Sequence, residues 1–100
     1  MKYNKLVRDK IPEILEEKGI KYKIHIADKK EYWEKLKEKL LEEIKEFSKS
    51  KSIDEFADIL EVLDAIKDFK KFDKKKLEMI KRKKAKERGG FKKRIILEES

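Results

Sequence analysis

Apolar residues recur at helical spacing in two long segments in the middle of the chain, and these segments predict a pair of helices. The first helix is predicted to follow an N-cap at Asp28 and to end at about Phe47 or Lys49. The second is predicted from Ile53 to about Lys70 and is apolar over more than half of its circumference, as in the central helix of a bundle. The polar linker Ser48–Ser52 is short, so the two helices should be antiparallel neighbours.

Two shorter elements precede this pair. Ile11–Gly19 predicts a helix with Pro12 in its first turn, Asp9 as a candidate cap and Gly19 as its stop. Tyr22–Ile26 alternates with a period of two, which predicts a strand.

Two elements follow the pair. A strongly basic helix is predicted from the cap Asp73 to about Arg88, ended by Gly89–Gly90. Phe91–Leu97 predicts a second strand that would pair with the first in a small ribbon. The fold class is therefore mainly α: an antiparallel helical bundle with a two-stranded β-ribbon, in a single domain covering residues 1–100.

The composition indicates a small core and excludes several kinds of site and location. With 38% hydrophobic residues and a mean hydropathy of −0.92, 100 residues supply little core, so a homodimer or homotetramer is expected. The absence of cysteine excludes disulfides and thiolate zinc sites, and no apolar run reaches membrane-spanning length. The N-terminus lacks a secretory signal, so a cytoplasmic protein without membrane attachment is expected. Abundant Lys and Glu without Gln or Thr resembles the composition of thermophile proteins.

Four acids on the central helices carry the strongest chemical signal. Glu43 and Glu46 are one helical turn apart, as are Glu55 and Asp58, and both pairs lie on the apolar side of their helix. Like charges about 5 Å apart repel by roughly 3 kcal/mol at an effective dielectric constant near 20. A shared divalent cation would offset this repulsion, and carboxylates suit Mg²⁺ or Mn²⁺.

Ordinary structural roles are open for the same acids. Ser52 and Glu55 fit a capping box, in which Glu55 satisfies the start of the helix. Glu43 has Lys39 one turn away, and Glu46 has lysines nearby at positions 45 and 49, so ion pairs are an alternative.

The acidic pattern, together with both ends of the chain, resembles a known family. Glu42-Glu43-x-x-Glu46 followed by Glu55-x-x-Asp58 is similar to the signature of the all-α nucleotide pyrophosphohydrolases, which include MazG-like enzymes and phosphoribosyl-ATP pyrophosphohydrolase. The opening Tyr3–Pro12 and the ending Lys83–Phe91 resemble a small branch of that superfamily. Only eight residues separate Glu46 from Glu55, fewer than is usual in the family, so the substrate pocket is expected to differ in shape.

The resemblance implies a Mg²⁺-dependent hydrolysis of a nucleoside triphosphate, or a related nucleotide, to a monophosphate and pyrophosphate. It assigns the metal to Glu43, Glu46, Glu55 and Asp58. A carboxylate near the attacking water would accept its proton, with Glu42 and Glu61 as candidates. The cations expected to contact substrate phosphates are Lys5, Arg8, Lys10, Lys84 and Arg88.

Two other functions fit parts of the sequence. The net charge of +8 indicates an anionic partner, and the basic helix after Asp73 would suit a nucleic-acid-binding module. The inward acids argue against that reading, because they would repel a nucleic acid. A helical homodimer that binds a partner without turnover is the other alternative.

Overall fold

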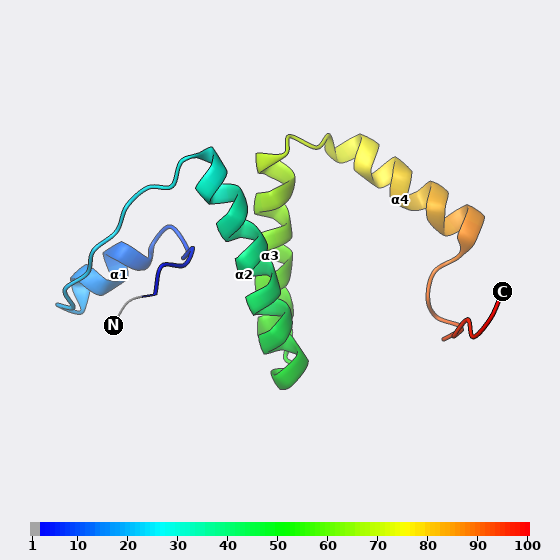
Figure 1. Cartoon of the computed structure of the whole chain (residues 1–100), viewed down its shortest axis with the longest axis horizontal. Coiled ribbons are helices and arrows are strands. Elements are labelled where there is room, and N and C mark those ends of the chain that lie inside the picture. Colours follow the sequence, from blue (N-terminus) through cyan, green and yellow to red (C-terminus); the bar gives the residue numbers. More distant parts are fainter. Residues whose placement is uncertain (1–2) are drawn as a thin grey trace. The chain divides into compact units, whose positions relative to one another are not determined.

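The computed structural model describes residues 3–100, and the chain divides into two compact units, Met1–Phe69 and Lys70–Ser100. The described part is mainly helical, as predicted (Figure 1). The prediction of one domain over residues 1–100 stays a prediction. No helix within residues 3–100 combines the length and the apolar character that crossing a lipid bilayer requires. The helices are α1 (Ile11–Glu17), α2 (Lys29–Ser50), α3 (Ile53–Phe69) and α4 (Lys74–Arg88).

The capping predictions largely agree with the observed helix ends. The side chain of Asp28 accepts a hydrogen bond from the Glu31 N–H at 2.8 Å at the start of α2, and Asp73 accepts one from the Lys76 N–H at 2.9 Å at the start of α4. Gly19 follows the end of α1 with a φ of +68°, a conformation that glycine adopts without strain. The prediction of Asp9 as a cap is wrong, because Lys10 is the N-cap of α1 and makes no side-chain cap bond.

Helix α2 continues further than its sequence predicts. It ends at Ser50, so only Lys51 and Ser52 connect it to α3, in place of the predicted linker Ser48–Ser52. Ser48 is helical, and its hydroxyl donates to the Ile44 carbonyl at 2.9 Å, so its side chain is satisfied within the helix. Lys51 then turns the chain with a φ of +53°, which brings α3 back along α2.

The antiparallel pair α2–α3 is the packed part of the first unit (Figure 1). Among the described residues only Leu36, Val62 and Glu43 are buried, so one of the three most enclosed side chains is a carboxylate. Aromatic contacts close both ends of the pair. The rings of Phe47 and Phe56 lie 5.4 Å apart at the turn, and Tyr32 meets Phe69 at 5.1 Å at the other end.

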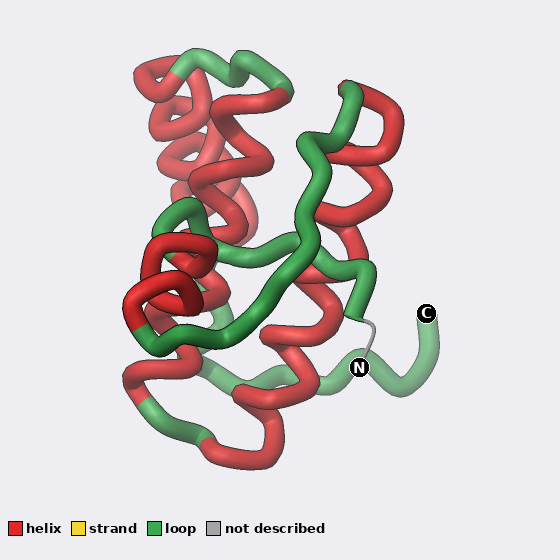
Figure 2. Tube along the Cα trace, turned by 90° about the vertical axis from the view of Figure 1, so that its left-hand side faces the viewer, coloured by secondary structure: helices red, strands yellow, loops and turns green. Residues whose placement is uncertain are grey.

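The predicted strands are not formed. Residues 22–26 and 91–97 are irregular, and no strand occurs in the described part of the chain (Figure 2). The alternating pattern was misleading because each segment offers only three or four apolar side chains, which is too little to stabilise an isolated two-stranded ribbon in water.

Candidate metal centre

Three carboxylates from α2 and α3 converge. Glu43, Glu55 and Asp58 each offer one oxygen, and these oxygens all lie within 4.8 Å of one another. Helical geometry explains the convergence. Glu43 is two turns from the fully buried Leu36, and Asp58 is one turn from the buried Val62, so the acids lie on the faces that meet between the helices.

The cluster contains polar atoms that the protein itself does not satisfy. Glu43 has a relative exposure of only 5%. The Oε2 atoms of Glu43 and Glu55 are buried and have no hydrogen-bond partner. A buried carboxylate oxygen without a donor is costly, because it has lost its hydration without replacement. The arrangement therefore calls for an additional donor or cation at this position.

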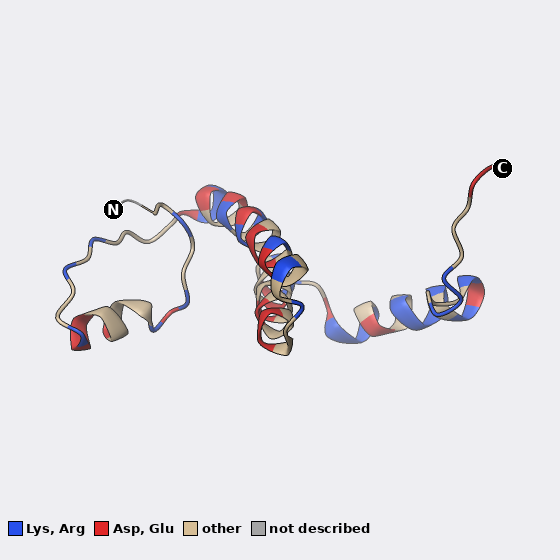
Figure 3. Ribbon diagram, turned by 90° about the horizontal axis from the view of Figure 1, so that it is seen from below, with Lys and Arg blue, Asp and Glu red and all other residues tan. Residues whose placement is uncertain are grey.

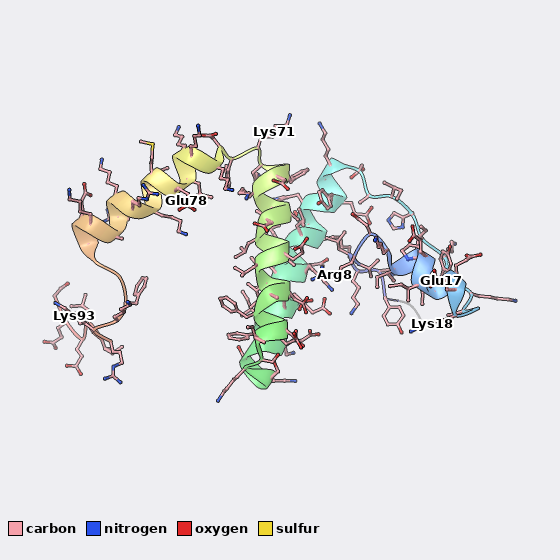
Figure 4. The ribbon with its side chains drawn as sticks, turned by 180° about the vertical axis from the view of Figure 1, so that it is seen from behind. Arg8, Glu17, Lys18, Lys71, Glu78 and Lys93 are labelled. Atoms are coloured by element: carbon pink, nitrogen blue, oxygen red, sulfur yellow. The ribbon has the colours of Figure 1, made fainter. Side chains whose placement is uncertain are left out.

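Two cations pair with acids of the cluster. The Lys39 Nζ lies 3.3 Å from Oε1 of Glu43, and the Arg8 Nη2 lies 2.7 Å from Oδ1 of Asp58. Arg8 reaches α3 from the N-terminal segment, which lies beside the helix pair (Figure 4). The oxygens that these cations engage are Oε1 of Glu43 and Oδ1 of Asp58, whereas Oε2 of Glu43 and Oε2 of Glu55 have no partner.

Glu55 is not occupied by a capping role. The Ser52 hydroxyl accepts from the Glu55 N–H at 3.2 Å, so Ser52 is the cap that the sequence predicts. The reciprocal bond of a capping box is absent, since the Ser52 N–H donates to the Ser50 hydroxyl at 3.2 Å. The side chain of Glu55 is thereby free to point into the acidic cluster.

Glu46, the fourth predicted ligand, lies at the edge. It is exposed and is not one of the three converging groups. Its carboxylate is nevertheless close enough to Glu55 for their repulsion to help raise the pKa of Glu55, after the larger effect of desolvation. The structure thus places Glu46 beside the cluster.

The two candidate bases have different surroundings. Glu42 bonds to the Lys5 Nζ at 2.9 Å and lies 3.5 Å from the Lys39 Nζ. The hydrogen bond from Lys5 lowers the pKa of Glu42 below its ordinary value, and Glu42 in turn raises the pKa of Lys5. Glu61 is exposed on α3. Neither belongs to the group of three.

The predicted phosphate-contacting cations fall into both units. Lys5 and Arg8 pair with Glu42 and Asp58, whereas Lys10 is exposed at the start of α1. Lys84 and Arg88 are exposed on α4, in the second unit. The sequence reasoning missed that Arg8 pairs with an acid of the cluster, and no local pattern could have revealed a contact between residues 50 positions apart.

Glu55 gives the cluster a pH dependence. Desolvation by burial, followed by repulsion from Glu46, Asp58 and Glu43, raises the pKa of Glu55 above its ordinary value of 4.5. The native state therefore holds this proton more tightly than the unfolded state. Ionised Glu55 destabilises the fold above its folded-state pKa, and that cost is removed as the pH falls through this pKa toward 4.5.

We expect Glu55→Gln to raise the midpoint of guanidinium unfolding at pH 7 in metal-free buffer, with no gain near pH 4. Glu42→Gln is the control of opposite sign. Because its folded-state pKa is below 4.5, its stabilisation is complete above pH 4.5 and is lost as the pH falls through the folded-state pKa. Its substitution should lower the midpoint at pH 7, and equal effects of both variants at every pH would contradict this assignment.

Comparison with family models, with curated proteins and with solved structures gives no match to this chain. The case for a function therefore depends on the geometry of the cluster and on the motifs in the sequence.

Proposed function

We propose that Glu43, Glu55 and Asp58 bind a divalent cation, and that the protein is a metal-dependent hydrolase. The observation that carries this proposal is the pair of buried, unpartnered oxygens on Glu43 and Glu55 within a three-carboxylate cluster. Opposite ligands of Mg²⁺ lie about 4.2 Å apart, from metal–oxygen distances of about 2.1 Å. Neighbouring ligands lie roughly 3.0 Å apart in the same octahedral geometry. The three carboxylate oxygens lie within 4.8 Å of one another, so they would have to approach one another by small side-chain rotations to bind one ion.

Within this class we propose a nucleotide pyrophosphohydrolase, which cleaves between the α- and β-phosphates to release pyrophosphate. The acidic motif and the two terminal segments support this choice, since all resemble that superfamily. A bound Mg²⁺ would neutralise phosphate charge and lower the pKa of a coordinated water. Few protein ligands are needed, because Mg²⁺ retains several waters.

The other roles in this reaction, which are binding the cation, contacting phosphate and accepting a proton, would fall to different residues. Glu43, Glu55 and Asp58 would hold the cation, with Glu46 at the edge to bind a second one or a coordinated water. Arg8 donates to Asp58 through one nitrogen, and its remaining N–H groups can hydrogen-bond phosphate oxygens. Glu42 and Glu61 are the two candidate bases, and either would have to turn toward the cluster, since neither is one of the three converging carboxylates. Glu42 would be ionised for this role, because the hydrogen bond from Lys5 lowers its pKa.

The test is pyrophosphate release from a panel of nucleoside triphosphates, with Mg²⁺, with Mn²⁺ and with a chelator. The proposal predicts metal-dependent release with at least one nucleotide. A non-catalytic homodimer that binds a partner protein predicts no release with any of them.

We also propose that the pair α2–α3 forms a helical bundle with a second copy of the chain. Large apolar side chains are exposed along the pair, although Leu36 and Val62 are the only buried hydrophobic residues in the described part of the chain. A pair of helices this thinly packed gains little from its own core. The exposed residues are Leu41, Ile44, Phe56, Leu60 and Leu63.

We expect Leu60→Glu with Leu63→Glu to shift the protein from a dimer or tetramer to a monomer in light scattering, because two charges would be buried at the interface. Met79→Glu is a control for an added charge, since Met79 is a still more exposed apolar residue and lies on α4. A wild-type protein that is monomeric at high micromolar concentration would contradict the bundle.

A further inference from the structure

The positive charge of the protein is concentrated in its second unit. Residues 70–100 contain 14 Lys and Arg against 5 Asp and Glu, a net charge of +9, whereas residues 1–69 contain 16 and 17, a net charge of −1. The acidic cluster belongs to the first unit. None of the clustered acids is therefore among residues 70–100, which carry the excess of positive charge.

Lys and Arg make up much of α4, whose ribbon is largely blue in Figure 3. At 100° per residue, Lys75, Arg82 and Lys86 lie within about 40° of one another, and other cations cover the rest of the circumference. Met79 is on nearly the opposite side of the helix from Leu77, so α4 has no continuous apolar face. A helix that lies on a membrane requires such a face, which makes a lipid surface a poor fit for α4.

A hollow lies directly after α4, and it combines cations with an exposed ring. It is a shallow hollow open to solvent, with a volume of about 430 Å³. Arg88, Lys93 and Arg94 line it together with Phe91, whose exposure is 98%. Lys93 lies on the segment that follows α4 (Figure 4). An aromatic ring among cations is the arrangement on which a nucleobase stacks beside bound phosphates.

We propose that residues 70–100 bind single-stranded nucleic acid without sequence preference, with phosphates along α4 and a base stacked on Phe91. A polymer fits better than a free nucleotide, because the basic array extends along a helix of 15 residues, roughly 22 Å in length. A single strand fits better than a duplex, because stacking on a side chain requires an unpaired base. This function is separate from the proposed hydrolysis and does not depend on it.

The test is fluorescence anisotropy of labelled 15-nucleotide single strands of RNA and DNA against the full-length protein, over a series of salt concentrations. We expect the triple variant Lys75→Gln, Arg82→Gln, Lys86→Gln to reduce the magnitude of the slope of log K against log[salt] by about two, at roughly 0.7 per lost phosphate contact. The control variant Lys21→Gln, Lys23→Gln, Lys49→Gln removes the same charge from exposed positions in the first unit and should leave the slope nearly unchanged.

Phe91→Ala tests the stacking step. It should weaken binding about five-fold or more at constant salt slope, because it removes a ring and no charge. Equal slopes for the two triple variants would overturn the proposal. So would full competition by micromolar nucleoside triphosphate, or binding to vesicles of anionic lipid with none to either oligonucleotide.

Discussion

Replacing Glu43 by glutamine, or Asp58 by asparagine, is expected to reduce pyrophosphate release by about 10²–10³-fold or more at saturating Mg²⁺. Each change keeps the shape of the side chain but removes the charge that would hold the cation, and loss of a single electrostatic contact to the reacting centre has effects of this size. The measurement is the steady-state rate with the best substrate of the nucleotide panel.

Glu38→Gln is the matched control for these variants. Glu38 lies on α2 as Glu43 does, but it is exposed and pairs with Lys35 at 3.1 Å, so its substitution should leave the rate nearly unchanged. Circular dichroism and thermal unfolding of each variant separate lost chemistry from lost folding. Wild-type rates in Glu43→Gln or Asp58→Asn would refute the proposed role of the cluster.

Binding of Mg²⁺ or Mn²⁺ is expected to raise the melting temperature by about 10 °C or more. A ligand at 100 times its Kd stabilises the native state by about 2.7 kcal/mol, and 1 kcal/mol shifts the melting temperature of a domain of this size by about 4–8 °C. Thermal unfolding with metal and with chelator measures this shift. If the protein does not melt below boiling, guanidinium unfolding at fixed temperature reports the same difference.

The double variant Glu43→Gln, Glu55→Gln should gain its stability without metal, whereas the wild type should gain it from metal. In chelator it should be more stable than the wild type, because it removes repulsion between ionised groups with unpartnered oxygens. Added metal should no longer raise its stability. A clear loss of stability in chelator would instead show that Lys39 already compensates the charge of Glu43 as a structural ion pair.

The sequence was sufficient to predict the inward position of Glu43, Glu55 and Asp58, but not the exposed position of Glu46. In a helix the side on which a residue lies is fixed by its spacing, so Leu36 and Glu43 necessarily share a face once Leu36 is buried. The same reasoning separated Glu43 from Glu42, which pairs with lysines at the side. Helical spacing did not distinguish Glu46 from the three converging acids. Spacing gives the direction of a side chain on its helix, but not how deeply it lies between two helices.

Contacts distant in the sequence could not be predicted in this way. The pairing of Arg8 with Asp58 depends on where the N-terminal segment crosses α3, and no periodic pattern contains that information. The strand predictions were wrong for a related reason. A strand requires a hydrogen-bonded partner, and the alternating pattern at residues 22–26 does not show whether such a partner exists. Caps such as Asp28 were predictable because their bonds extend over three residues only.

The most direct test of the central claim is a crystal soaked with Mn²⁺ and measured for anomalous scattering. The account predicts a peak between the carboxylates of Glu43, Glu55 and Asp58, within bonding distance of the two oxygens that have no partner in the protein. No peak at that position in a well-diffracting crystal, with the Lys39 or Arg8 side chain filling the space, would contradict it.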